Sequence, residues 1–125
     1  MYNKCNLIGH LGKDPEIKTV GDIVVGKFSL ATGKKYKNKS GETVEETQWH
    51  NIVVWGKGAE IAEKYLKKGS FVLVEGEIRY RTWEGEDKIK KYFTEIYCLE
   101  FKMLDKKPGN KKPIDVSGEI DEPPF

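Results

Sequence analysis

Two tryptophans in the run Thr47–Trp55 could stack against flat rings. Strand geometry alternates side chains, so Trp49, Asn51 and Trp55 share one face, while His50 lies on the other. Six residues of strand separate the two indoles by about 20 Å. A lone tryptophan is usually a core residue, but a face that also carries an asparagine favours an exposed surface. We therefore expect this face to bind planar groups such as nucleobases.

The run Phe71–Trp83 adds positive charge to a similar pattern. Alternation places Arg79, Arg81 and Trp83 on one face and Tyr80 on the other. Guanidinium groups neutralise phosphates and pack on rings, and an indole stacks on bases. The two runs together predict a platform for a nucleic acid.

The segment Gly33–Glu46 is polar around Ser40-Gly41 and predicts a long hairpin loop. Its one aromatic residue, Tyr36, lies among four lysines: Lys34, Lys35, Lys37 and Lys39. Contact with phosphates and bases and a simply solvated charged loop are equally consistent with this pattern.

The spacing of apolar residues indicates the helix and strands that would position these side chains. We expect one amphipathic helix from about Ala59 to Lys68, with Gly69 as its C-terminal cap. Phe28 and Leu30 should face the core. The expected strands are residues 2–11, Ile17–Val20, Ile23–Thr32, Thr47–Trp55, Phe71–Trp83 and Lys88–Leu104. A helix between the third and fourth barrel strands is the order of an OB-fold, a five-stranded Greek-key barrel. Its usual ligand surface would lie near the loops Gly12–Glu16 and Glu84–Asp87.

Composition restricts the function classes. With 125 residues, 34% charged and 38% apolar, the chain suits one domain with a modest core. No apolar run approaches the ~18 residues of a membrane span, and no secretion signal is apparent. Cys5 and Cys98 match no metal-binding spacing and are expected to be reduced thiols of a cytoplasmic protein. We expect no metal and no cofactor.

No catalytic constellation is apparent, so we expect no enzyme activity. His10 and His50 lack a neighbouring nucleophile or carboxylate in the sequence. The glutamates of the later strands, Glu75, Glu77 and Glu95, are interpreted as surface charge.

The composition changes after Leu104. Residues 105–125 hold four of the five prolines and little apolar content, which predicts a disordered tail beyond a domain of residues 1–104. Residues 115–125 carry a net charge of −4, against +6 for residues 1–114. A basic body with an acidic segment is common among nucleic-acid-binding proteins.

Several ordered motifs run through residues 1–104. They are Asn3-Lys4, Gly9-His10-Leu11-Gly12-Lys13-Asp14-Pro15-Glu16, Phe28-Ser29-Leu30-Ala31-Thr32, Thr47-Gln48-Trp49-His50, Val53-Val54-Trp55-Gly56-Lys57, Ala59-Glu60, Tyr65-Leu66-Lys67-Lys68-Gly69-Ser70, Val74-Glu75-Gly76 and Arg79-Tyr80-Arg81-Thr82-Trp83. In this order they resemble one family, the bacterial-type single-stranded DNA-binding proteins.

The resemblance implies a homotetramer of OB-folds that wraps single-stranded DNA in replication, recombination and repair. It implies base stacking by four aromatic residues: Tyr36, Trp49, Trp55 and Trp83. It also implies a subunit interface at His50. Cys5 and Asn6 stand where strand 1 of the family usually has an aliphatic pair, so we assign them to that interface as well.

The final residues resemble the family's acidic-Pro-Phe end. The resemblance implies that this end docks DNA-maintenance proteins through Asp121, Glu122, Pro123, Pro124 and Phe125. It implies a location in the bacterial cytoplasm, associated with the nucleoid. Two alternatives stay open: an OB-fold accessory subunit acting through protein–protein contact, and a single-stranded RNA binder.

Overall fold

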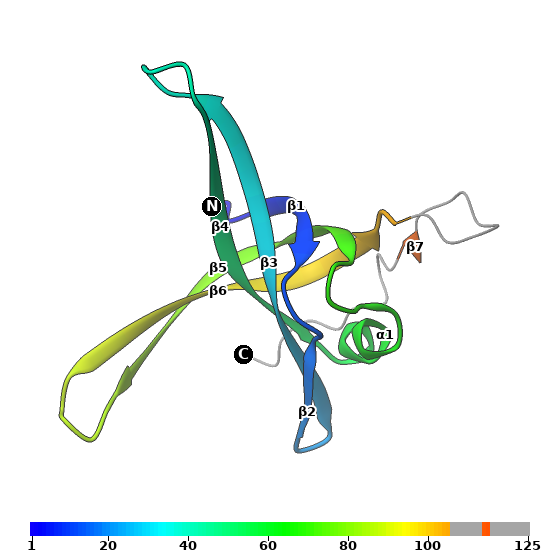
Figure 1. Cartoon of the computed structure of the whole chain (residues 1–125). Coiled ribbons are helices and arrows are strands. Elements are labelled where there is room, and N and C mark those ends of the chain that lie inside the picture. Colours follow the sequence, from blue (N-terminus) through cyan, green and yellow to red (C-terminus); the bar gives the residue numbers. More distant parts are fainter. Residues whose placement is uncertain (106–113, 116–125) are drawn as a thin grey trace.

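The computed structural model describes residues 1–105 and the short strand Ile114–Asp115, and the other tail residues lie outside the described part. Along these described residues, seven strands and one helix follow in order (Figure 1). Their bounds are β1 Cys5–Leu11, β2 Glu16–Val20, β3 Ile23–Lys37, β4 Thr43–Trp55, α1 Lys57–Tyr65, β5 Phe71–Glu84, β6 Lys90–Met103 and β7 Ile114–Asp115.

Five of these strands curl into a partly open barrel. The order along the sheet is β1-β5-β6-β4-β3-β2, and β1 also pairs with β3 at His10 and Leu11. A short parallel pairing joins β1-β5-β6 to β4-β3-β2. In it, Ile52 and Val53 of β4 lie opposite Ile96 and Tyr97 of β6. With α1 between β4 and β5, this is the expected OB-fold. Among the described residues, the short strand β2 pairs with β3 alone and β7 with β6 alone.

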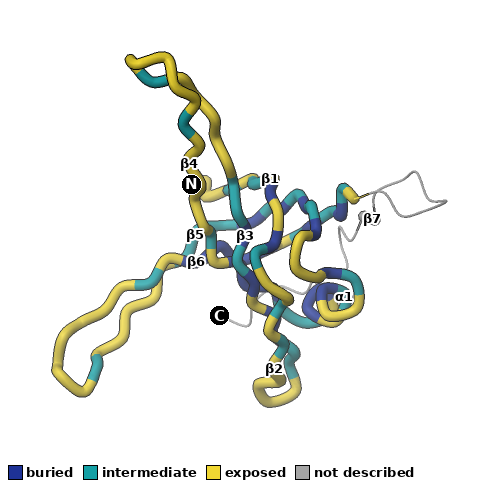
Figure 2. Tube along the Cα trace, viewed as in Figure 1, coloured by how far each residue is buried: buried dark blue, intermediate teal, exposed yellow. Residues whose placement is uncertain are grey.

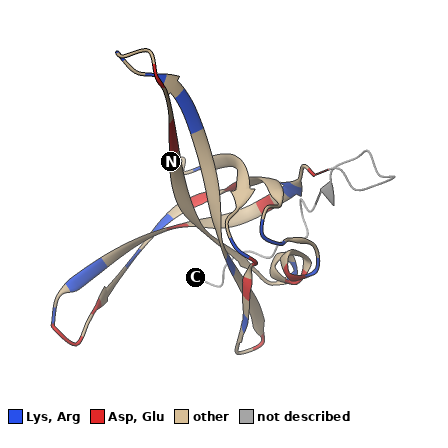
Figure 3. Cartoon of the chain, in the orientation of Figure 1, with Lys and Arg blue, Asp and Glu red and all other residues tan. Residues whose placement is uncertain are grey.

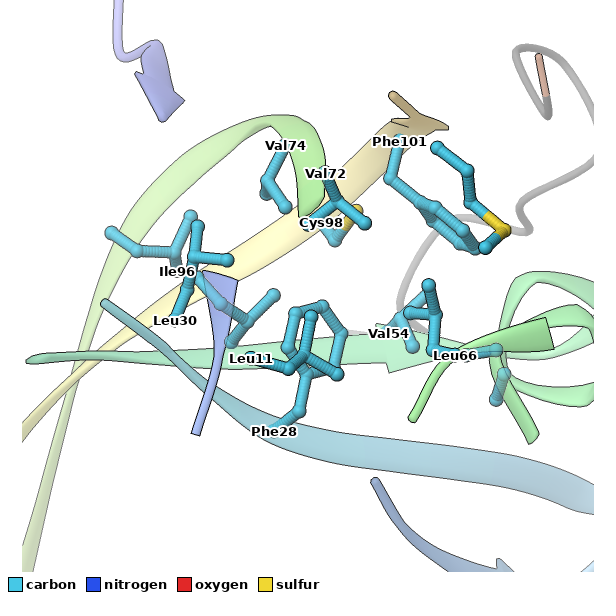
Figure 4. Packing of buried hydrophobic residues seen from close by; sticks show 14 residues of the cluster. Leu11, Phe28, Leu30, Val54, Leu66, Val72, Val74, Ile96, Cys98 and Phe101 are labelled. Atoms are coloured by element: carbon cyan, nitrogen blue, oxygen red, sulfur yellow. The ribbon is translucent and has the colours of Figure 1, made fainter. Parts of the chain in front are cut away.

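The core lies inside the barrel and under α1, and its apolar side chains interdigitate (Figure 4). Phe28 and Leu30 of β3 are buried as predicted, and they share the core with Phe101 of β6. The helix contributes Ala59 and Ala62, both fully buried. Gly9 lets β1 cross β3 closely, because a Cβ there would lie 2.1 Å from the carbonyl oxygen of Ala31.

Two long hairpins project from this barrel into solvent (Figures 1 and 2). We call the β3–β4 extension, residues 32–48, the ribbon, and the β5–β6 extension, residues 79–95, the arm. The ribbon corrects a prediction: Gly33–Glu46 is not a loop, because β3 and β4 pair in register out to Lys37 and Thr43. Only residues 38–42 form the turn, in which the Asn38 Oδ1 accepts the backbone N–H groups of Ser40 and Glu42, both at 3.0 Å.

The helix also ends earlier than predicted. It stops at Tyr65, and Leu66 adopts an extended conformation, so Gly69 is not its C-terminal cap. Gly69 instead has a φ of 89° in the turn before β5, where its N–H donates to the carbonyl oxygen of Leu11 at 2.8 Å. A positive φ explains the glycine there as well as a cap would.

Candidate nucleic-acid interface

The barrel has a second, smaller apolar cluster on its outer surface. Val53 of β4 and Tyr97 of β6 are buried there beside Val25 of β3. Trp55 packs on this cluster, with its ring centroid 6.3 Å from that of Tyr97. Trp55 is therefore half-buried and stabilises the outer surface, and its exposed part lies on the face shared with Trp49.

Trp49 is open to solvent, with 59% of its surface exposed. One edge of its indole lies against Gly12, in the turn after β1, so that this turn supports the ring. The rest of the ring faces outward, as stacking on a base requires.

A groove runs from this turn toward the base of the arm, with a volume of about 280 Å³. Its walls carry three cations and two neutral polar side chains: Lys13, Lys27, Arg81, Ser29 and Asn51. Three carboxylates also line it, Asp14, Glu16 and Glu95. Lysine, arginine and amide groups at these positions suit a phosphodiester backbone and the polar edges of bases. Lys13 and Lys27 were missed in the sequence because Lys13 has no aromatic neighbour and the aromatic neighbour of Lys27, Phe28, was assigned to the core.

The arm continues this surface beyond the groove. Trp83 is 49% exposed and meets Phe93 edge-on, with ring centroids 6.2 Å apart. The Arg81 guanidinium lies 6.0 Å from the Phe93 ring centre. Phe93 is directly opposite Arg81 in the β5–β6 register, so the cross-strand pairing brings it into the site. Its sequence neighbours gave no such signal.

Both arginines of the arm already have carboxylate partners. The Arg79 guanidinium pairs with Glu77, with Nε at 2.7 Å, and lies 5.1 Å from the Tyr97 ring centre. Arg81 Nε lies 2.7 Å from Oε1 of Glu95. Glu95 is only 2% exposed, so its interpretation as surface charge is wrong. The position of each guanidinium is thus fixed, while about half of the Arg81 side chain stays exposed.

The ribbon places its candidate residues differently. By strand alternation Tyr36 lies on the ribbon face opposite Trp49, and it is 44% exposed. Lys34 and Lys35 lie directly across from Glu46 and Glu45, and Figure 3 shows basic and acidic residues along the ribbon. The opposing carboxylates reduce the net positive charge that the lysines were expected to bring.

The residues assigned to a subunit interface lie apart from the platform. His50 faces the side opposite Trp49, and its Nε2 is 2.8 Å from the Thr32 hydroxyl. Cys5 and Asn6 belong to β1, which pairs with β5 along one edge over these residues. Asp121, Glu122, Pro123, Pro124 and Phe125 lie outside the described residues.

Comparison with known proteins agrees with this geometry. The family model described as "Single-strand binding protein family" matches residues 2–104. The chain belongs to this family. Single-stranded DNA-binding protein 1 of Chlorobaculum tepidum is 43% identical over 125 residues, covering 98% of this chain and 77% of the relative. The single-stranded DNA-binding protein of Xanthomonas campestris is 46% identical over 103 residues, covering 82% of this chain and 60% of the relative.

A solved structure supports the single-strand binding fold directly. The "Plasmodium falciparum SSB complex with ssDNA" superposes with a TM-score of 0.77 at 36% identity, covering 84% of this chain and 96% of that one. Within the described residues of this family member, no group of His, Cys, Asp and Glu side chains is arranged to hold a metal ion. No described helix is long and apolar enough to span a membrane.

Proposed function

We propose that this chain binds single-stranded DNA without sequence preference. The observation that carries the proposal is a pair of exposed indoles beside one groove: Trp49 packs on Gly12, next to the turn that lines the groove, and Trp83 packs on the groove residue Phe93. Stacking does not depend on the base sequence, because every base offers a flat ring face, and it contributes roughly 1–3 kcal/mol per base. Family membership supports the same ligand.

In this proposal the outer surface binds rings and the charged side chains bind phosphates. Trp49, Trp55 and Trp83 stack bases, with Tyr36 as a further ring on the ribbon. Arg81 and the groove lysines meet the backbone, and Arg79 and the ribbon lysines Lys34, Lys35 and Lys37 add charge along the path.

Assembly and recruitment belong to the proposal too. We place His50, Cys5 and Asn6 in the interface of a homotetramer, and we assign recruitment of replication, recombination and repair proteins to Asp121–Phe125. The bacterial cytoplasm, at the nucleoid, is the proposed location. Sedimentation of the full chain, and partner capture with and without those last five residues, test these points.

Titration with poly-dT tests the central proposal through quenching of tryptophan fluorescence. We expect tight binding to poly-dT, weak binding to duplex DNA, and a log–log salt slope near −0.7 per neutralised phosphate. Trp83→Ala should cost about 1–3 kcal/mol. Poly-U serves as the comparison strand. Equal affinity for poly-U would extend the ligand to RNA, and no quenching by poly-dT would refute the proposal.

A further inference from the structure

The arm exposes aromatic rings on both of its faces. Strand alternation places Arg81, Trp83 and Phe93 on the first face, which belongs to the proposed platform. The second face carries Tyr80 and Tyr92, which are 73% and 74% exposed. No residue of the second face was part of the predicted site.

The two tyrosines form one small surface. Tyr80 lies opposite Thr94 and Tyr92 lies opposite Thr82, so the rings are diagonal neighbours on adjacent strands. Such neighbours are about 7–8 Å apart, with the two threonines beside them. Both phenol rings are thus presented together.

This surface is uncovered within the described chain because the arm has only two strands there. β4 pairs with β6 at Ile96 and Tyr97 and no farther out. The arm extends away from the barrel, and most residues of its outer part are exposed (Figure 2). A tyrosine ring held in water by a two-stranded hairpin contributes little to folding, so a core role does not explain these residues.

The charges on this face point to ring contact rather than phosphate contact. Its ionisable groups are Glu84 and Lys90, which lie directly opposite one another, besides the two phenols. A cation facing a carboxylate leaves little net charge for a polyanion. A bound strand would therefore be held here by stacking.

We propose that the second face of the arm is an additional contact for single-stranded DNA, in which Tyr80 and Tyr92 stack on bases of the strand that leaves the first face. The inference rests on the proposed function. The second face is continuous with the proposed platform, because both faces belong to one narrow hairpin. A DNA strand that crosses the edge of the arm passes directly from Trp83 to the two tyrosines.

The test compares four full-length proteins in poly-dT titrations at several salt concentrations. They are the parent, Tyr80→Ser/Tyr92→Ser, Tyr80→Phe/Tyr92→Phe, and Tyr2→Ser as a matched loss of a tyrosine that is 87% exposed outside the arm. We expect the serine pair to lose at least about fivefold in affinity per ring, with the salt slope unchanged. The phenylalanine pair and Tyr2→Ser should bind like the parent.

Iodouracil-substituted oligonucleotides give a second readout. Photo-cross-links in the parent should map to Tyr80 or Tyr92 as well as to Trp83. A serine pair that binds within twofold of the parent, or an absence of cross-links to both tyrosines, would overturn the inference. So would a loss in the phenylalanine pair as large as in the serine pair, or a serine pair that changes the oligomer mass and leaves DNA affinity intact. A parent that fails to bind poly-dT would instead overturn the proposed function.

Discussion

The indole of Trp49 lies directly on the backbone of Gly12: a Cβ built at Gly12 would be 2.4 Å from Cζ3 of the ring. The indole that we propose as a stacking group on the sheet is thus oriented by a turn from another part of the chain. The contact explains why a glycine is needed where no unusual backbone angle requires one.

Gly12→Ala should therefore displace the Trp49 ring. We expect a loss of binding to poly-dT close to that of Trp49→Ala, about 1–3 kcal/mol, because the displaced ring is no longer held in the position proposed for stacking. The folding free energy should change by less than about 1 kcal/mol, since the ring is mostly exposed. Fluorescence titration and urea unfolding measure the two effects. Gly33→Ala, which meets no atom within 4 Å, is the control, and equal affinities for parent and Gly12→Ala would refute the expectation.

The Arg81–Glu95 pair should respond unequally to the loss of each partner. Arg81→Met leaves a carboxylate that is 2% exposed without its cation, which should destabilise the fold by roughly 3 kcal/mol. Glu95→Gln leaves a half-exposed guanidinium that water can solvate, so it should cost less. Urea unfolding gives both values. Equal losses of unfolding free energy, or a larger loss for Glu95→Gln, would contradict the prediction that the buried carboxylate of Glu95 depends more on its partner than Arg81 does.

Stability should depend on pH through Glu75. A hydrogen bond with Glu100, followed by burial and the Glu100 charge, raises the pKa of Glu75 above its ordinary 4.5, although Lys4 at 3.9 Å and Lys102 oppose the shift. The native state then binds its proton more tightly than the unfolded state. The resulting stabilisation is complete below pH 4.5 and is lost as the pH rises through the native pKa.

Glu75→Gln removes this dependence. Because the Gln side chain resembles the neutral carboxyl, the variant should be more stable than the parent toward pH 7, and this difference should disappear below pH 4.5. Urea midpoints across this range measure the difference, and Glu84→Gln on the arm is the matched control. A parent-to-variant difference that stays constant with pH would contradict the raised pKa.

Both thiols should resist alkylation in the native protein. Burial raises the pKa of Cys5 and, far more strongly, that of Cys98, which is 1% exposed. The thiolate is the reactive form, so iodoacetamide at pH 8 should label Cys98 only after unfolding in urea. The two residues flank Gly76 in the sheet, about 10 Å apart, which is too far for a disulfide. Rapid native labelling of Cys98, followed by mass spectrometry, would contradict this prediction.

The barrel was predictable because its strands bury apolar residues at every second position. Phe28, Leu30, Val72 and Val74 are such residues, and all four are in the core. The ribbon was not predictable in this way, because neither face of Gly33–Lys37 covers a core and its side chains show no apolar alternation. Cross-strand hydrogen bonds alone define those strands.

The aromatic residues of the candidate site could be predicted from the sequence, but the contacts between its strands could not. Alternation within one strand placed Trp49 on the same face as Trp55, and Arg81 on the same face as Trp83. It could not show that Phe93 lies opposite Arg81 or that Glu95 holds Arg81, since both depend on the register of β5 with β6. Burial of Glu95 depends on that register as well.

The position of β1 has a consequence for synthesis on the ribosome. Cys5 and its neighbours pair with β5, with Cys5 opposite Gly76, so most of β1 has no partner until β5 has been translated. Only the end of β1, His10 and Leu11, also pairs with β3, which is made earlier. The ribbon, by contrast, joins sequence neighbours. We expect β3 and β4 to pair first and the barrel to close late, in milliseconds to seconds, as in other folds dominated by distant contacts. Nascent chains arrested before β5 should be readily digested by protease, and chains released after β6 should become resistant.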